Sequence, residues 1–397
     1  MFTRDKHGSI ESGADNATKA IARPDIVRYR VAYDEFKDAL MIAPENGGSW
    51  KPFADTDYTR LRIELERRGF KSPGSELVRD AVKLVGNNNR FDSAQDWANS
   101  LVWDGIERVE MFLATHYRAE DTNYARAVSL YMWTALAGRC LQPGVQADMS
   151  PIFVSGQGTG KTRGIRAMAP EEGSFVEVNL EHRDDNVARS LRGKLVGELA
   201  ELRGLMTRDA ESIKAWMTRT HEEWIPKYQE FAVRFARRLL FIGTTNEDEF
   251  LADATGERRW LPIRVGESDI EMIERDRDQL WAEAISLFKK GGIIWRDAQA
   301  LAVEHHAEFK VQDSWEEPIR RWLETDEMDS EDGEPRKMRP FKLHEMLSSA
   351  LSLDPKNVSR REELRAGRVL RTLGLRRGSA RLEGHVQKCW YFAIETT

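Results

Sequence analysis

The feature that most constrains this chain is a glycine-rich stretch, residues 151–162, which reads Pro-Ile-Phe-Val-Ser-Gly-Gln-Gly-Thr-Gly-Lys-Thr. The apolar run 152–154 predicts a β-strand, and the segment 163–168 that follows is compatible with a helix. A strand, a glycine-rich turn, Lys161 and Thr162 in this order are typical of a phosphate-binding loop (P-loop). In such a loop, backbone N–H groups and the lysine contact phosphate oxygens, and the threonine hydroxyl binds Mg²⁺. The sequence therefore predicts a nucleotide-binding protein.

The loop departs from the strict pattern G-x-x-x-x-G-K-[ST] at one position, because Ser155 stands where the first glycine is expected. Gly156 and Gly158 still leave the turn the backbone freedom it needs. The alternative is an ordinary glycine-rich turn followed by a chance Gly-Lys-Thr. The residues expected to contact the nucleotide are Ser155, Gly156, Gln157, Gly158, Thr159, Gly160, Lys161, Thr162 and Arg163.

Composition narrows the class of protein. The chain has 397 residues, of which 41% are hydrophobic and 32% charged, and this predicts a globular, soluble protein of two or three domains. Its formal net charge of −6 means that any contact with nucleic acid must come from a local basic feature. The two cysteines, Cys140 and Cys389, exclude a disulfide scaffold and favour a reducing cytoplasm. Neither an apolar run of ~20 residues nor a signal-peptide pattern occurs, so we expect no membrane contact and no secretion.

Changes in periodicity divide the chain into five segments. These are a flexible polar leader (1–23), a mainly helical domain (24–145), a P-loop domain with C-terminal helices (146–323), an acidic linker (324–335) and a small C-terminal domain (336–397). Helical spacing of apolar residues predicts helices over 58–68, 75–85, 106–115, 124–141 and 270–290. The C-terminal domain has the size and element order of a winged-helix module, with two or three short helices and a terminal strand.

Five short apolar runs, separated by helices and turns, predict the strands of the P-loop domain. They are 152–155, 175–178, 194–199, 239–244 and 260–265. Strands that alternate with helices favour a mainly parallel sheet with helices on its faces, here with a P-loop after the first strand. The expected fold class is therefore an α/β P-loop core between a helical N-terminal domain and a winged-helix-like C-terminal domain.

Carboxylates follow the third predicted strand. Glu198 lies at its end and Glu201 three residues later, so that one can serve Mg²⁺ and the other the attacking water. We assign the metal to Thr162 and Glu198. The usual arrangement places two acidic residues side by side, and the alternative here is a half-buried strand followed by a solvated glutamate.

The fourth predicted strand ends in Asn246. An amide at this point can hydrogen-bond the γ-phosphate or position the water, which is the sensor role in motor ATPases. Ordinary capping of a strand end by asparagine is the competing interpretation.

Two adjacent arginines, Arg258 and Arg259, follow a Thr-Gly-Glu turn and precede the last predicted strand. Paired arginines in such a turn are suited to an arginine finger, which stabilises charge on the transferred phosphoryl group from a neighbouring subunit. This interpretation requires a ring or filament, and the alternative is a surface turn held by salt bridges.

Basic and aromatic residues alternate between 221 and 238, a pattern that fits phosphate contact and base stacking on a single nucleic-acid strand. The candidates for contact with DNA are Lys227, Tyr228 and Arg234. The alternative is a solvated charged face.

Further short motifs complete an ordered set. They are 101–108, Pro143-Gly144 with Asp148, 156–162, 191–194, 198 with 201–202, 211–214, 243–246, 255–260 and 279–284. Over about residues 30–325 this set resembles the virulence-associated protein E family. Its members are P-loop proteins of phages, plasmids and mobile islands, are related to superfamily 3 helicases and often follow a primase domain.

The resemblance implies an AAA+-like ATPase domain, a hexameric ring, ATP and Mg²⁺ as cofactors, and translocation on single-stranded DNA during replication. Two features depart from the family. The loop 225–229 lacks the Arg-x-Pro-Tyr-Gly-Arg pattern expected there, and no primase-like domain or zinc motif precedes the helical region. Primase activity would then come from a separate chain.

We therefore expect an ATP-dependent replicative DNA helicase of a phage or mobile element, acting on single-stranded or forked DNA in the cytoplasm of a bacterial host. A separate primase or polymerase is a further expected partner. The alternative is an AAA+-type replication initiator or helicase loader that binds duplex DNA through its C-terminal domain and uses ATP only for assembly. A P-loop kinase for small molecules is disfavoured, because it needs neither the paired arginines nor two flanking domains.

Overall fold

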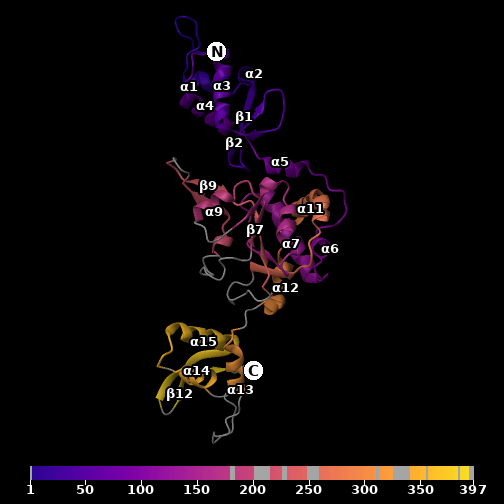
Figure 1. Cartoon of the computed structure of the whole chain (residues 1–397), viewed down its shortest axis with the longest axis vertical. Helices are drawn as coiled ribbons and strands as arrows, with labels where there is room; N and C mark the ends of the chain where they lie inside the picture. Colours follow the sequence, from indigo (N-terminus) through magenta and orange to yellow (C-terminus); the bar gives the residue numbers. More distant parts are fainter. Residues whose placement is uncertain are drawn as a thin grey trace. The chain divides into compact units, whose positions relative to one another are not determined.

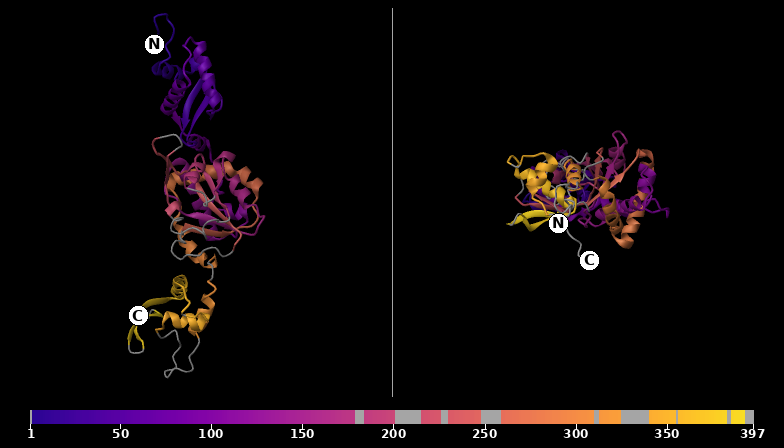
Figure 2. Two further views of the ribbon diagram at one scale, coloured as in Figure 1. Left: turned by 60° about the vertical axis from the view of Figure 1, so that its left-hand side comes forward. Right: turned by 90° about the horizontal axis from the view of Figure 1, so that it is seen from below.

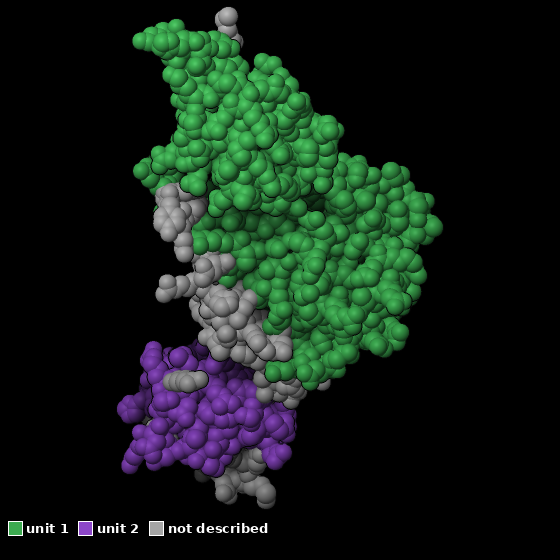
Figure 3. Space-filling view, turned by 45° about the horizontal axis from the view of Figure 1, so that its top comes forward, with its two compact units in different colours: residues 1–309 green, residues 310–397 purple. Residues whose placement is uncertain are grey.

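The computed structural model describes residues 2–178, 184–200, 215–225, 230–247, 259–309, 313–324, 340–354, 356–382 and 385–392. Contacts divide the chain into two compact units, Met1–Phe309 and Lys310–Thr397 (Figure 3). Each unit has a hydrophobic core of its own.

The first unit begins with a small α/β layer. Its elements are α1 (Ala14–Ile21), α2 (Pro24–Val27), β1 (Tyr29–Asp34), β2 (Ala39–Pro44), β3 (Lys51–Pro52), α3 (Asp55–Arg67), α4 (Ser75–Asn88) and β4 (Arg90–Phe91). The strands form a sheet in the order β3-β2-β1-β4, in which β1 and β2 are antiparallel. The predicted helices 58–68 and 75–85 are present as α3 and α4, but the sequence reading missed the sheet beside them. Strands β3 and β4 have only two residues each, and in β1 and β2 buried residues do not alternate regularly with exposed ones, so no strand pattern stands out in the sequence.

The prediction of a flexible leader in residues 1–23 is wrong. Helix α1 turns Ala17, Ala20 and Ile21 into the same core as Val82 of α4. The buried side-chain amide of Asn16 donates to the backbone oxygens of Thr3 and Glu11. It thereby fixes the segment that precedes α1 against this helix. Two alanines and one isoleucine make a weak apolar stripe, which is why the composition of this segment looked polar.

A five-stranded parallel sheet forms the centre of the first unit (Figure 1). Its strands are β5 (Ser150–Val154), β6 (Phe175–Glu177), β7 (Val196–Leu199), β10 (Leu240–Thr245) and β11 (Trp260–Arg264), in the order β11-β5-β10-β7-β6. All pairings in it are parallel. The five predicted strands and their parallel arrangement are therefore confirmed, each within two residues of its expected ends.

Both faces of this sheet are covered. Its helical neighbours are α5 (Ser93–Ser100), α6 (Phe112–Tyr117), α7 (Asn123–Leu141), α8 (Lys161–Ala167), α9 (Asp184–Ser190), α11 (Ile270–Gly291) and α12 (Arg296–His306). Phe153 of β5 points into a core shared with Trp133 of α7 and Trp281 of α11, whose rings meet edge to face. The alternate residues Ile152 and Val154 belong to a second core on the other face. Such double burial explains the near-continuous apolar character of the strands.

The predicted helices over 124–141 and 270–290 are confirmed as α7 and α11. The helix expected over 106–115 begins only at Phe112, because residues 101–111 make a different set of contacts that is described below. No helix in the described ranges is long and apolar enough to span a membrane.

The second unit consists of α13 (Glu316–Glu324), α14 (Leu343–Leu351), α15 (Arg360–Thr372) and the antiparallel pair β12 (Leu375–Leu382) and β13 (His385–Phe392). The yellow hairpin and the helices beside it can be followed in Figure 2. Phe341, just before α14, also forms a bridge with Trp390 of β13. Trp322 of α13 lies in the core of this unit, so the unit begins before the acidic segment, and not at residue 336 as predicted. Most of the acidic linker, residues 325–335, lies outside the described residues.

Candidate nucleotide-binding site

The predicted P-loop connects the end of β5 to the start of α8. Gly158 and Gly160 have φ angles of 85° and 80°, a left-handed conformation that glycine adopts without the cost a side chain would bring. Gly160 is the residue directly before the helix, and Lys161 is its first residue. The turn therefore depends on glycine at both of these positions, as the sequence pattern indicates.

Ser155 has a definite role at the position where the strict pattern has glycine. Its hydroxyl lies 2.7 Å from the Thr159 hydroxyl, so the two side chains join the ends of the loop. The same Ser155 oxygen accepts a hydrogen bond from Lys161 Nζ at 3.0 Å. The serine thus holds the loop closed on itself and positions the lysine.

Lys161 is almost fully buried, with 8% of its surface exposed. Its ammonium group also donates to the backbone oxygens of Ser155, at 2.8 Å, and Gly156, at 2.9 Å, and to Asn246 Oδ1 at 2.9 Å. Burial lowers the pKa of Lys161, while the charge of Glu198 raises it. Since β10 lies next to β5, the end of β10 brings Asn246 to the lysine, as the sensor interpretation requires.

Glu198 lies on β7 and is fully buried. Its Oε1 accepts hydrogen bonds from the hydroxyls of Thr162 and Thr244, both at 2.8 Å. Its Oε2 is buried and has no hydrogen-bond partner among the described residues. Burial raises the pKa of Glu198, and the two hydroxyl donors act against that shift. Thr244 is a site residue that was not predicted from the sequence. Its position at the end of a strand, two residues before Asn246, could have indicated it.

Four predicted site residues lie outside the described part of the chain, namely Glu201, Lys227, Tyr228 and Arg258. Arg259 is described and directly precedes β11. Since Trp260 pairs with Ser150, the first residue of β5, Arg259 lies about 16 Å of strand length from the end of β5 where the predicted P-loop begins. Its Nε is 3.9 Å from Asp148 Oδ2, in a pocket of about 300 Å³ that Tyr131 and Trp295 help to line. Arg259 therefore does not reach the P-loop of its own chain.

The basic and aromatic segment forms a hairpin of β8 (His221–Trp224) and β9 (Val233–Ala236). Several charged and aromatic residues of this segment are buried and support the fold. The segment as a whole is therefore not one continuous surface for contact with DNA. Trp224 is buried, Arg237 is buried against Glu222, and Arg238 is buried against Asp92. Arg234 is exposed on β9, as expected for a DNA contact. Phe231, which the sequence reading passed over, is 79% exposed beside it.

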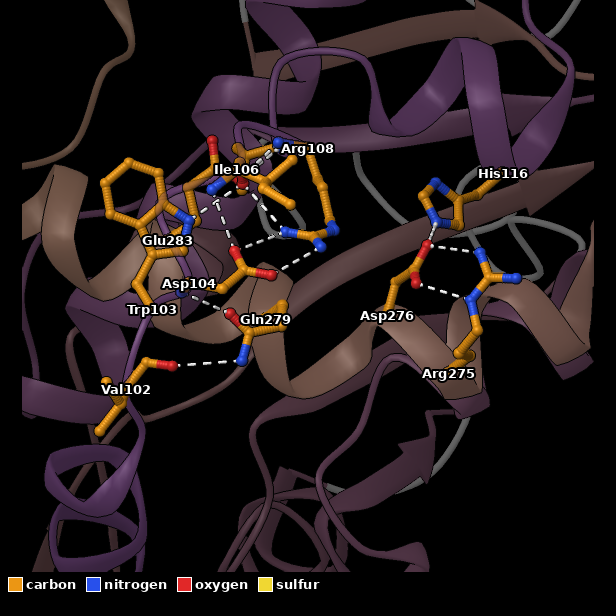
Figure 4. Close-up of polar contacts among 11 residues, drawn as sticks. Val102, Trp103, Asp104, Ile106, Arg108, His116, Arg275, Asp276, Gln279 and Glu283 are labelled. Atoms are coloured by element: carbon orange, nitrogen blue, oxygen red, sulfur yellow. Dashed lines mark hydrogen bonds and ion pairs between the residues drawn. The ribbon is translucent and has the colours of Figure 1, made fainter.

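Two of the sequence motifs, 101–108 and 279–284, meet in a clasp, which we define as residues 102–109 with Gln279 and Glu283 of α11 (Figure 4). Asp104 accepts two hydrogen bonds from the Arg108 guanidinium, at 2.8 and 2.9 Å, and closes the turn. Gln279 accepts from the backbone N–H of Asp104 and donates to the Val102 oxygen. These polar residues therefore hold the segment before α6 on α11, and none of them lies in the P-loop.

Glu283 is the buried member of the clasp, with 2% of its surface exposed. Its Oε2 accepts the backbone N–H groups of Arg108 at 2.6 Å and Val109 at 3.0 Å, and burial raises its pKa. About two turns before Glu283 on α11, Asp276 contacts His116 of α6 at 3.1 Å (Figure 4). Helix α11 therefore holds both the segment before α6 and α6 itself.

We expect Glu283→Ala to lower the free energy of unfolding by about 3 kcal/mol, because it leaves two N–H groups, one of them in a buried residue, without an acceptor. Gln279→Ala is the matched control, since it removes two hydrogen bonds at exposed positions of the same helix and should cost about 1 kcal/mol or less. Urea unfolding followed by tryptophan fluorescence measures both. If both variants lowered the free energy of unfolding by the same amount, Glu283 would not be the buried residue that stabilises the clasp.

Comparisons with known proteins agree with the resemblance seen in the sequence. No curated protein matches the chain. Among solved structures, the apo structure of the NrS-1 C-terminal region has a TM-score of 0.54 at 13% identity and covers 92% of this chain and 96% of that one. A second form of the same region has a TM-score of 0.52 at 14% identity, covering 92% of this chain and 97% of that one. At such identities the likeness shows a shared fold alone. The model of the virulence-associated protein E-like domain matches residues 98–311, more than half of the chain, and the protein therefore belongs to the virulence-associated protein E-like family.

Proposed function

We propose that this protein is an ATP-dependent replicative DNA helicase of a phage or mobile element, in which a ring of P-loop ATPase domains moves along single-stranded DNA. The observation that carries the proposal is the meeting of Lys161, Thr162, Glu198 and Asn246. Lys161 and Thr162 begin the helix after β5, Asn246 directly follows β10 and Glu198 lies on β7, and hydrogen bonds of 2.8–2.9 Å link these residues and Thr244. A lysine, a hydroxyl, a carboxylate and an amide in one place are the groups that phosphoryl transfer to water requires.

Lys161 is the residue that holds the phosphates in this proposal. Its ammonium is surrounded by neutral oxygens of Ser155, Gly156 and Asn246, and it can exchange these for the charged oxygens of the β- and γ-phosphates. Charge-assisted hydrogen bonds of this kind are stronger than those it gives up. Asn246 would then be released from the lysine to contact the γ-phosphate or the attacking water.

The donor set at Thr162 and Glu198 fits Mg²⁺, which binds oxygen ligands and takes few of them from the protein. Glu198 Oε2 is buried without a partner in the described ranges, and the Thr162 hydroxyl lies 2.8 Å from the other oxygen. When bound, Mg²⁺ would neutralise charge on the β- and γ-phosphates. Thr162 and Glu198 would hold it, Thr244 would orient the carboxylate, and Glu201 remains our candidate for the water.

The oligomeric part of the proposal rests on the arginines. Arg259 lies at the end of β11 remote from its own P-loop, a position from which an arginine finger can act only on a neighbouring subunit. We propose that Arg258 or Arg259 acts in this way within a hexameric ring, and that the β8–β9 hairpin, with exposed Phe231 and Arg234, contacts the single strand.

The test is ATP hydrolysis by the purified chain without DNA, with single-stranded DNA and with blunt duplex, on samples sized by light scattering. We expect single strands to stimulate hydrolysis several-fold, and we expect a mass near six times the 45.6 kDa of one chain. Displacement of a paired strand is the assay that follows. A ring whose rate of ATP hydrolysis is unchanged by single-stranded DNA would favour the initiator or loader alternative. A monomer that does not hydrolyse ATP would contradict the proposal.

A further inference from the structure

Positive charge is concentrated near the C-terminus of an otherwise acidic chain. Residues 356–391 contain ten lysines and arginines against three glutamates, whereas the whole chain has a formal net charge of −6. The excess lies on α15 and on the β12–β13 hairpin that follows it. A local surplus of this size points to a polyanionic partner.

Helix α15 separates its core residues from its charged ones. Ala366, Val369 and Leu370 are buried in the core of the second unit. On the opposite side, Arg360 and Arg368 are exposed and Leu364 between them is 58% exposed, at a spacing of four residues that places all three on one face. This exposed face of α15 is therefore a row of positive charge around an apolar residue.

The two acidic residues of α15, Glu362 and Glu363, both lie in its first turn, where negative charge favours a helix N-terminus. Glu362 belongs to the N-terminal cap, where its carboxylate accepts from both the backbone N–H and the hydroxyl of Ser359. Within the described residues, Arg360 and Arg368 form no ion pair. Arg365 shows the contrast, because it is bound to Asp313 at 2.7 Å and lies over the Trp315 ring at 4.2 Å. Arg365 is structural, and the arginines of the exposed face are not.

The hairpin extends the same surface. Trp390 of β13 packs beside Gly367 of α15, and the Arg371 guanidinium lies 5.8 Å from the centre of its ring. Arg377 is paired with Trp390, so both point to the side of the hairpin that meets α15. Lys388 lies two residues before Trp390 and therefore on that side too, and both cations are exposed.

We propose that the exposed face of α15 and the adjoining side of the β12–β13 hairpin form a binding site for duplex DNA, separate from the site for a single strand. Helix α15 has 13 residues and is about 20 Å long, and the major groove, ~12 Å wide, admits a helix. Residues 352–359 join α14 to α15, a longer connection than the short turn of a helix-turn-helix, and α15 is the helix whose exposed arginines would enter the groove.

The side chains favour a duplex over a single strand. A site for a single strand combines basic residues with aromatic rings on which bases stack. The exposed face of α15 has arginines and Leu364 but no aromatic residue, and the largest ring nearby, Trp390, is buried. A ridge of guanidinium groups on a helix suits the paired phosphate rows of a groove.

The double variant Arg360→Ala, Arg368→Ala tests the site in the full-length chain, by fluorescence anisotropy with a blunt duplex and with a single strand of equal length. We expect duplex affinity to fall about tenfold or more, and the slope of log affinity against log salt to decrease by roughly 2, since two phosphate contacts are lost. Affinity for the single strand and ATP hydrolysis without DNA should not change. The proposed ATPase activity and the proposed duplex site are therefore tested by separate measurements, and either proposal can be wrong without the other.

The matched control is Arg320→Ala, Arg321→Ala, which removes the same charge from exposed positions of α13 in the same unit. These arginines are paired with Glu316 and Glu317, so duplex affinity should stay within about twofold. The variant Arg360→Lys, Arg368→Lys keeps the charge and should restore binding. Unchanged duplex affinity in the alanine variant, equal loss in the control, or no recovery with lysine would each overturn the proposal.

Discussion

Lys161→Ala is expected to lower the rate of ATP hydrolysis by on the order of 10²–10³-fold, the usual loss when one preorganised donor to a transferring phosphoryl group is removed. The physical reason is that the ammonium is the one charged donor seen within the loop, held by oxygens on Ser155, Gly156 and Asn246. Affinity for ATP should fall as well, because the lysine contacts the phosphates before and during the reaction. A coupled assay of phosphate release, with nucleotide binding measured separately, gives both quantities.

The control for this variant is Lys194→Ala. Burial lowers the pKa of Lys194 as it does for Lys161, and its Nζ donates to a backbone oxygen, that of Gly173 at 2.7 Å. It precedes β7 and lies outside the P-loop, so hydrolysis should remain within about twofold of the unmodified protein. A Lys161→Ala protein that is folded and hydrolyses ATP at the normal rate would contradict the assignment of the nucleotide site.

Glu198→Gln is expected to lower hydrolysis by on the order of 10²-fold or more while leaving the protein at least as stable. Glutamine can still accept from the hydroxyls of Thr162 and Thr244, but it lacks the negative charge that a Mg²⁺ ligand supplies. ATP binding in the absence of Mg²⁺ should be preserved, which separates this variant from Lys161→Ala.

The stability effect has a defined pH dependence. Because burial raises the pKa of Glu198, the folded state holds its proton more tightly than the unfolded state does. Above the folded-state pKa the buried carboxylate is ionised and lowers stability, and this cost disappears as the pH falls through the ordinary range of a carboxyl group. Glu198→Gln should therefore raise the melting temperature at pH 8 without Mg²⁺, and the difference should shrink towards pH 4.

Glu177→Gln controls for charge near the site. Glu177 is paired in register with Glu198 on the neighbouring strand β6, but its side chain is exposed. Its negative charge contributes to the raised pKa of Glu198, so removing it should raise the melting temperature less than Glu198→Gln does and leave hydrolysis within about twofold. If the two glutamine variants behaved alike, the special role of Glu198 would be wrong.

Local sequence pattern was sufficient to predict the central sheet and the loop that follows its first strand in the chain, β5. Strands buried on both faces read as apolar runs, and glycines before Lys161 mark a turn that needs left-handed backbone. From the order of these elements alone, the parallel sheet and the approach of Glu198 and Asn246 to Lys161 could be predicted. Parallel strands end at one edge of a sheet, and residues at their ends must therefore meet.

Pattern was less informative where residues depend on distant partners. The charged segment 221–238 looked like one surface, yet Arg237 and Arg238 are buried because Glu222 and Asp92 are there to pair with them. The clasp residues were identified in the sequence only as two separate motifs, but they satisfy backbone groups between segments some 175 residues apart in the chain. Neither partner can be found from local spacing.

The sequence by itself determined that this chain has a glycine-rich loop between a strand and a helix, a parallel sheet and a set of motifs found in one family, because each of these depends on residues close together in the chain. The tertiary structure decided which polar residues support the fold and which remain available. Arg365 and Arg368 are three residues apart on one helix, but only Arg365 is within ion-pair distance of Asp313. Whether a charge is neutralised depends on what folding brings beside it, and that information is carried by the whole chain.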